Sequence, residues 1–218
     1  MYVSFKKYIY DYPLDKIKNI ELNQLQKGDI ILSVKSQQRI DNNMFFKIIS
    51  KITHSRIGHS TIFIGLNKKN KPEYLDIRTG DATIKKLILN SDSIRYMRSQ
   101  RKYSNDVVGL VLRIKNELSK IEEEQIIKYL TNKLNLRYGF LKVVYALTFG
   151  KIYELLPVDK LRLKNPDQSL KTMFCSELVI RAYDSANIYL SNKSDPAETA
   201  PADLLNSPQL EVIGYINN

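Results

Sequence analysis

The chain has 218 residues, 43% of them apolar, so it is long enough to bury the core of one large domain or of two small ones. Its 34 Lys and Arg residues outnumber its 23 Asp and Glu residues by 11, which favours anionic surroundings such as nucleic acid, anionic lipid or an acidic cell-wall polymer. The sequence shows no zinc-ligand spacing, no Gly-rich aromatic strand signature and no block of consecutive basic residues, so we expect no nucleic-acid partner.

Residues 1–26 show no strong period and are interpreted as an N-terminal arm, either extended or forming a short helix. After this arm, turn residues separate short apolar runs, and apolar residues at helical spacing mark one helix. The predicted elements are a buried strand at Ile30–Leu32 after the turn Lys27-Gly28-Asp29, a helix over residues 44–52, and strands at residues 59–65 and 73–78 joined by a polar turn.

In the second half of the chain, Ser119 and Glu122 form a capping-box pair ahead of apolar residues at helical spacing, which predicts a helix start. The other predicted elements are a strand at residues 107–114, helices over about 140–150 and 173–186, a polar basic loop at 157–169, a helical turn at 201–205 and a final strand at 209–216.

Helices and strands are mixed without strict alternation, and short loops separate several strands. This pattern favours an α+β fold with an antiparallel sheet over a doubly wound parallel sheet. No internal repeat or linker divides the chain, so we expect one domain over residues 27–218 after the arm.

Cys175 is the sole cysteine of the chain and lies in the first turn of the helix predicted near residues 173–186. A lone thiol cannot form an internal disulfide, and a helix N-terminus stabilises a thiolate through the helix dipole and unpaired N–H groups. A reactive nucleophile is therefore one hypothesis. The alternative is a buried cysteine that packs as a small apolar residue.

A thiol nucleophile needs a general base, and the sequence contains two histidines, His54 and His59. His59 opens a predicted strand and is the preferred base, whereas His54 lies in the preceding connection and ranks second. A third polar group should orient the imidazole, and Asp76 on the next strand is well placed if the two strands pair. Glu73 and Asp81 are the fallback acids.

Each of these residues also has an ordinary structural explanation. A histidine at a strand start is often an exposed turn residue, and Asp76 could bind a backbone amide or pair with Arg78. The conjunction of thiol, histidine and acid is stronger than any of the three alone.

The order of motifs resembles the YiiX-like proteins, which are circularly permuted members of the papain-like, NlpC-type cysteine hydrolases. The likeness spans about residues 27–216. Its motifs are Lys-Gly-Asp before an apolar strand, a His opening a strand that ends in Gly, an acid on the next strand, Tyr138-Gly139, Phe-Cys-Ser-Glu-Leu-Val at residues 174–179, and Pro-Ala-Asp-Leu at residues 201–204.

The resemblance implies a papain-like α+β fold in which a helix carrying the nucleophile packs on a small antiparallel sheet or partial barrel. Cys175 matches the family's nucleophile, His59 its base, and Asp76 the position of an orienting acid that is commonly a glutamate. Tyr138 matches a tyrosine near the nucleophile that helps bind the substrate carbonyl, with ordinary packing as its alternative. Glu177 is interpreted as structural, because two residues after the thiol it points elsewhere on the helix.

The expected activity is cleavage of an amide bond, by a cell-wall peptidase or amidase, through a thioester acyl-enzyme. The alternatives are an acyl hydrolase or acyltransferase of the lecithin:retinol acyltransferase-like type, directed at lipids, and a catalytically silent binding module. We expect no cofactor and no metal, since the two histidines and one cysteine lack zinc-site spacing. The expected partners are a peptide or acyl-amide substrate and an anionic cell-wall polymer or membrane surface.

Residues 1–19 contain Asp11 and Asp15 and lack the apolar segment of a secretory signal. The most apolar stretch, residues 140–149, is interrupted by Lys142 and reaches about half the roughly 20 residues of a membrane span. We therefore expect a soluble protein, cytoplasmic in the chain as given, with the cell envelope as the alternative if a signal peptide has been removed.

Overall fold

The computed structural model describes a sheet, the helices packed on it and part of the N-terminal segment. The described residues are 17–35, 40–41, 47, 50–51, 53, 55–66, 68, 72–77, 84–88, 107–133, 137–138, 172–193 and 195–217. At residues 72, 76–77, 84–88, 107–108, 137–138, 172 and 217 the description covers the backbone alone.

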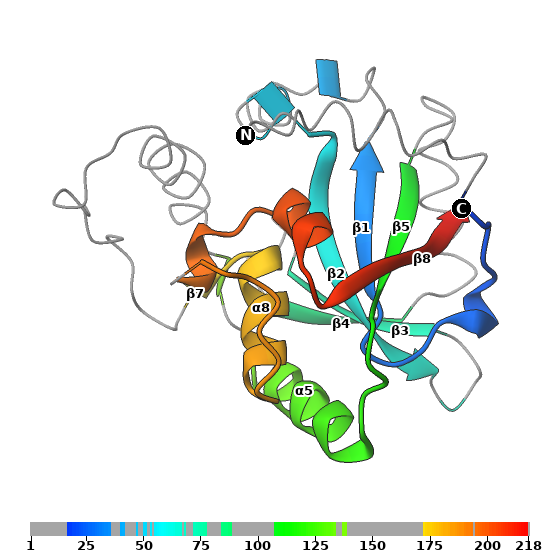
Figure 1. The fold of residues 1–218 in the computed structure, drawn as a ribbon, viewed down its shortest axis with the longest axis vertical. Coiled ribbons are helices and arrows are strands. Elements are labelled where there is room, and N and C mark those ends of the chain that lie inside the picture. The colour runs from blue at the N-terminus through cyan, green and yellow to red at the C-terminus, as the bar shows by residue number, and fades with distance from the viewer. Residues whose placement is uncertain are drawn as a thin grey trace, which may run out of the picture.

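A six-stranded sheet forms the centre of the fold, with the strand order β4-β3-β2-β1-β5-β8 (Figure 1). Every neighbouring pair in this sheet is antiparallel, which confirms the predicted α+β class. The strands are β1 (Ile30–Lys35), β2 (Ile57–Leu66), β3 (Pro72–Ile77), β4 (Ile84–Ile88), β5 (Val107–Ile114) and β8 (Leu210–Asn217).

Helix α8 (Cys175–Asp184) lies on one face of the sheet, and helix α5 (Lys120–Asn132) packs against α8 (Figure 1). Helix α8 packs directly against β2 and β3. Its apolar side, which includes Leu178 and Tyr183, shares a buried core with Ile30 and Leu32 of β1. Apolar residues at helical spacing thus meet alternate residues of a strand, as the two periodicities require.

The N-terminal segment from residue 17 crosses the other face of the sheet. Ile20 and Leu25, which flank the short 3₁₀ helix η2 (Leu22–Gln24), pack against Ile31 and Phe63. The apolar run Ile30–Leu32 is therefore covered on both faces, which explains why it does not alternate with polar residues. Residues 17–26 are part of the packed structure, and the domain boundary at residue 27 stays a prediction.

Glycine at position 214 permits this close approach of the N-terminal segment to β8. A Cβ built on Gly214 would lie 2.5 Å from the carbonyl oxygen of Lys18. Backbone hydrogen bonds then join the two segments, with Tyr215 N donating to Lys18 O at 3.0 Å and Ile20 N donating to Tyr215 O at 2.9 Å.

Several predicted elements are confirmed at or near their expected bounds. The strand at residues 107–114 matches β5, the capping box of Ser119 and Glu122 begins α5, and the turn predicted at residue 201 is the 3₁₀ helix η5 (Pro201–Asn206). Of the helix expected over residues 44–52, the described positions 47, 50 and 51 are helical, as are 40, 41 and 53 around it. The helix expected at 140–150 and the loop at 157–169 lie outside the described residues.

The predicted start of the cysteine helix at Met173 is wrong. Met173 belongs to a two-residue strand, β7 (Thr172–Met173), that pairs in parallel with β6 (Arg137–Tyr138). The apolar residues before Cys175 continue the helical spacing, so the prediction started the helix too early. In the structure Met173 pairs with β6 as a strand, and the helix begins only after Phe174. The helix then runs from Cys175 to Asp184 and stops two residues before the expected end.

Candidate active site

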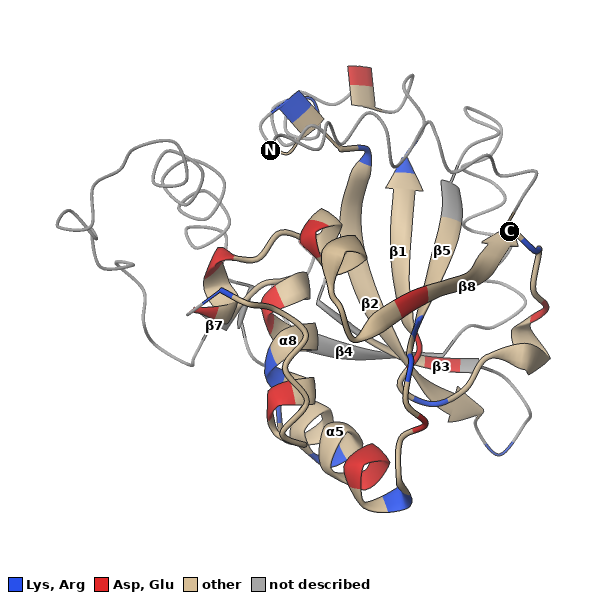
Figure 2. Cartoon of the chain, in the orientation of Figure 1, with Lys and Arg blue, Asp and Glu red and all other residues tan. Residues whose placement is uncertain are grey.

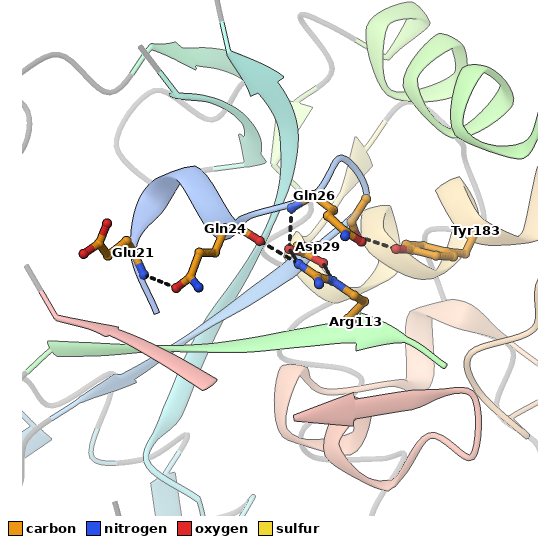
Figure 3. A network of polar contacts seen from close by, with 7 residues as sticks. Glu21, Gln24, Gln26, Asp29, Arg113 and Tyr183 are labelled. Atoms are coloured by element: carbon orange, nitrogen blue, oxygen red, sulfur yellow. Dashed lines mark hydrogen bonds and ion pairs between the residues drawn. The ribbon is translucent and has the colours of Figure 1, made fainter. Parts of the chain in front are cut away.

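The turn Lys27-Gly28-Asp29 is fixed by a buried ion pair (Figure 3). Gly28 has a φ of +93°, a left-handed conformation that favours glycine. Arg113 of β5 donates two hydrogen bonds to the Asp29 carboxylate, from Nε to Oδ1 and from Nη2 to Oδ2, each 2.7 Å long. Gln26 N also donates to Oδ2 at 2.7 Å. The hydrogen bonds that Arg113 donates to Asp29 raise the pKa of Arg113.

Tyr183 links this turn to helix α8 (Figure 3). Its hydroxyl donates a hydrogen bond to the carbonyl oxygen of Gly28, from a side chain that is fully buried. Burial raises the pKa of Tyr183 above its ordinary value, which keeps the hydroxyl protonated and able to donate. The turn before β1 and the helix that carries the thiol are therefore joined across 155 residues of sequence.

Cys175 is the first residue of α8 and is 4% exposed. The N-cap residue is Phe174, whose side chain supplies no hydrogen-bond acceptor, so no side-chain cap competes for the first-turn amides. Those amides lack intrahelical acceptors and point towards the helix N-terminus. The backbone therefore presents partial positive charge at the thiol.

The two residues after the thiol anchor the start of α8. Ser176 is fully buried and its Oγ donates to the carbonyl oxygen of Thr199 at 2.6 Å. Glu177 is likewise buried and its Oε1 accepts from Nε of Arg181 one turn later at 2.9 Å. The interpretation of Glu177 as structural agrees with this ion pair. The Cys-Ser-Glu sequence thus combines one candidate reactive group with two anchors.

The segment that follows Thr199, whose carbonyl oxygen accepts the Ser176 hydrogen bond, is fixed by the half-buried side chain of Asp203. Asp203 of η5 accepts hydrogen bonds from Ala200 N and from Nζ of Lys193, both at 2.9 Å. Lys193 also donates to the carbonyl oxygen of Glu198 at 2.9 Å. Helix η5 packs against β2 as well as α8. The motif Pro-Ala-Asp-Leu therefore packs against both the cysteine helix and the strand of His59.

His59 lies on β2, the strand that α8 crosses, and is half-buried. It pairs with Ser33 of β1, whereas Ile57 pairs with Val34, so one extra residue, Gly58, bulges between them. Bulges bend a strand and turn a side chain away from its regular direction. The structure thus brings the strand of the preferred base against the helix of the thiol.

The backbone places the other two predicted residues near the same elements. Tyr138 pairs with Met173, two residues before Cys175. Asp76 pairs with Lys85 of β4, and the neighbouring pair Ile62–Leu75 sets position 76 one step further along β2 towards His59. The side chains of Asp76 and Tyr138 are not described, so their roles remain predictions.

The alternative residues are placed less favourably or lie outside the described part of the chain. Glu73 pairs with Gly65 at the far end of β2 from His59. His54 and Asp81 lie outside the described residues. The choice of His59 as base and Asp76 as acid remains a prediction.

Sequence reasoning missed three buried polar features near this site. The first is the Asp29–Arg113 pair, for which the Lys-Gly-Asp motif is the one local signal. The second is Lys35, which is 8% exposed beside Gly58, and the third is Ser60, whose Oγ is buried without a hydrogen-bond partner in the described structure. No local pattern marks the second and third, because register decides what a strand residue faces.

The charges and donor sets of the described residues give no further site. Along α5 and α8, acidic and basic residues are interspersed rather than gathered by sign (Figure 2). Among the described residues, no three His, Cys, Asp or Glu side chains form a group that could hold a metal ion. Within the same part of the chain, no helix combines the length and apolar character needed to cross a membrane.

The fold defines an α+β protein in which the helix bearing the sole cysteine crosses an antiparallel sheet bearing a histidine. Among solved structures, the chain is similar to metalloprotein YiiX from Escherichia coli O157:H7, with a TM-score of 0.54 and 17% sequence identity. The match covers 88% of this chain and 97% of that one. The predicted YiiX-like architecture is thereby confirmed as a fold.

Comparison by sequence adds no relative. No family model matches the chain, and no curated protein matches it either. The activity must therefore be argued from the site itself.

Proposed function

We propose that the chain is a cysteine hydrolase that cleaves an amide bond with Cys175 as nucleophile and His59 as general base. The observation that supports this most is the position of the sole cysteine, at the first residue of a buried helix that packs across the strand of His59. Asp76 would orient the imidazole, and Tyr138 would contact the substrate carbonyl.

The reaction divides into acylation and hydrolysis. The thiol of Cys175 gives its proton to His59, and the sulfur attacks the carbonyl carbon. The backbone N–H of Cys175 donates to the developing oxyanion, because a first-turn amide has no intrahelical acceptor. The C–N bond breaks as the imidazolium protonates the leaving amine, and a thioester remains. Water then attacks the thioester, which releases the acid and restores the thiol.

Metal chemistry has no part in this proposal. The similar solved structure, YiiX, is described as that of a metalloprotein. Among the residues that the structure describes, no three His, Cys, Asp or Glu side chains form a group that could hold a metal ion, and we assign no step to a metal.

Alkylation of the thiol tests the nucleophile and its base without knowledge of the substrate. The chain has one cysteine, so iodoacetamide should give a single adduct whose rate is read by intact-mass spectrometry. We expect His59→Ala to slow alkylation at neutral pH by tenfold or more, since the thiol loses the base that ionises it. His54→Ala is the matched control and should alkylate at the wild-type rate.

Two outcomes would reject the proposal. One is a native thiol that reacts no faster than a free cysteine peptide. The other is an alkylation rate that is equal in wild type and His59→Ala. If His54→Ala rather than His59→Ala slows the reaction, the base has been assigned to the wrong histidine.

The substrate class needs a second experiment. Wild type and Cys175→Ala are incubated with muropeptides, with N-acyl amides and with phospholipids, and products are identified by mass spectrometry. We expect product from muropeptides with wild type alone. Product from the lipid panel alone would replace the cell-wall assignment with a lipid-directed acyl hydrolase or acyltransferase.

A further inference from the structure

A buried carboxylate lies in the first turn of α8, two residues after the candidate nucleophile. The side chain of Glu177 is 0% exposed, and its Oε1 accepts a hydrogen bond from Nε of Arg181 at 2.9 Å. A negative charge at this end of the helix disfavours a Cys175 thiolate, because like charges repel and a buried charge is weakly screened. The ion pair of this carboxylate therefore concerns the thiol as well as the stability of the helix.

Arg181 brings a positive charge to the same turn. It follows Glu177 by one helical turn, but helical side chains lean towards the N-terminus, and the 2.9 Å contact places the guanidinium next to the carboxylate. Its Nη2 also lies 3.5 Å from Oδ1 of Asp195, which accepts a hydrogen bond from Ala197 N at the start of the 3₁₀ helix η4 (Pro196–Glu198). The guanidinium is thus oriented from two sides.

Other titratable groups of the described structure also interact with this pair, namely Asp184, Asp195 and Tyr129. Burial raises the pKa of Tyr129 to about 12, so its phenol is neutral at the pH of thiol ionisation. Asp184 is the last residue of α8 and Asp195 contacts the outer side of the guanidinium. Along α8 itself, Glu177 and Arg181 are the charged residues closest to Cys175 in sequence.

We propose that Arg181 is a positioning residue that acts on Cys175 through Glu177: it offsets the charge of the buried carboxylate, so that the first turn of α8 keeps the positive potential that favours the thiolate. The inference rests on the proposed function, because it takes Cys175 as the nucleophile. It adds to that function a dependence on charge balance, since the helix dipole alone would act against an unopposed carboxylate in the same turn.

Removal of each charge should shift the ionisation of the thiol in opposite directions. The rate of iodoacetamide alkylation is measured against pH, and the pH of half-maximal rate reports ionisation, whereas altered access to the thiol changes the maximal rate alone. We expect Arg181→Met to raise this midpoint by about 0.5–1 pH unit, and Glu177→Gln to lower it by a similar amount. These signs follow from the charge removed, whichever other groups contact Glu177.

Three further variants separate charge from anchoring. The double variant Glu177→Gln with Arg181→Met removes both charges and should return the midpoint close to the wild-type value. Arg181→Lys retains the charge and should do the same. Lys115→Met is the matched control for loss of one positive charge, because Lys115 Nζ donates to the carbonyl oxygen of Pro208 on an exposed surface, where salt screens it. Far-UV circular dichroism checks that each variant is folded.

Shifts of the same sign in Arg181→Met and Glu177→Gln overturn the proposal, since they report a lost anchor rather than a lost charge. Unchanged midpoints overturn it equally. If Arg181→Met fails to fold, Glu177→Gln decides, because a midpoint that does not fall contradicts the proposal. Failure of the proposed function has a different signature. In that case His59→Ala is alkylated at the wild-type rate, whatever the two shifts.

Discussion

Removal of Arg113 should destabilise the protein more than removal of its partner, Asp29, although each change breaks the same pair. The side chain of Asp29 is 1% exposed, whereas that of Arg113 is 23% exposed. Arg113→Ala therefore leaves a buried carboxylate whose described donor is Gln26 N alone. Asp29→Ala leaves a guanidinium that reaches water and still donates to the carbonyl oxygen of Gln24 at 3.0 Å.

The expected magnitudes follow from this asymmetry. Breaking a buried pair so that a charge remains uncompensated costs about 3–5 kcal/mol, which we expect for Arg113→Ala. Loss of hydrogen bonds to a charged group that stays partly solvated costs about 1.5–3 kcal/mol, which we expect for Asp29→Ala. Lys27→Ala is the control, because the Lys27–Glu123 pair is 48% and 31% exposed and should be worth less than about 1 kcal/mol.

Urea unfolding followed by far-UV circular dichroism measures all three free energies, since the chain has no tryptophan for fluorescence. The reasoning is refuted if Asp29→Ala costs as much as Arg113→Ala, or if either costs no more than Lys27→Ala. If the three free energies follow the expected order, the ion pair stabilises the turn before β1 chiefly because the Asp29 carboxylate is buried and needs a partner.

Three further substitutions test other parts of the fold by the same unfolding assay. Ser60→Ala should stabilise the protein by about 1 kcal/mol, because it removes a buried hydroxyl without a hydrogen-bond partner in the described structure, and destabilisation would contradict this. Ser119→Ala should cost about 1 kcal/mol at pH 7. Hydrogen bonds from Ser119 lower the pKa of Glu122 below its ordinary value, so this cost should shrink as pH falls through that pKa. A cost independent of pH would speak against the capping box. Desolvation raises the pKa of Asp184 at the C-terminal end of α8, where negative charge is unfavourable. Asp184→Asn should therefore stabilise the protein by less than about 1 kcal/mol at pH 7 and lose that advantage in acid, where Asp184 is protonated. Equal stability of the two proteins at pH 7 would refute this.

Local features of the sequence predicted the local parts of this structure. The capping box at Ser119 involves residues three apart, and the start of α5 follows from it. Strand β4 was not predicted, because its sequence Ile-Lys-Lys-Leu-Ile follows neither a helical nor an alternating pattern. It forms through pairing with β3 alone, at an edge of the sheet where lysines are common.

Long-range features decided the site and could not be read from the sequence. Arg113 reaches Asp29 across 84 residues and Tyr183 reaches Gly28 across 155, so no window of sequence contains both partners. The bulge at Gly58 depends on the register between β1 and β2. A one-residue difference in register reverses the face on which a strand residue lies, so residue type alone cannot orient His59.

Three residues other than Cys175 anchor helix α8, two of them directly after the thiol. Ser176 binds the Thr199 carbonyl, Glu177 binds Arg181, and Tyr183 binds the turn before β1. In the proposed reaction, anchors directly after Cys175 would hold its backbone N–H and its sulfur in a defined position relative to the substrate carbonyl. The same reasoning predicts that Ser176→Ala should alter the alkylation rate of Cys175 more than Tyr183→Phe does, because Ser176 lies next to the thiol, whereas Tyr183 lies about two turns away.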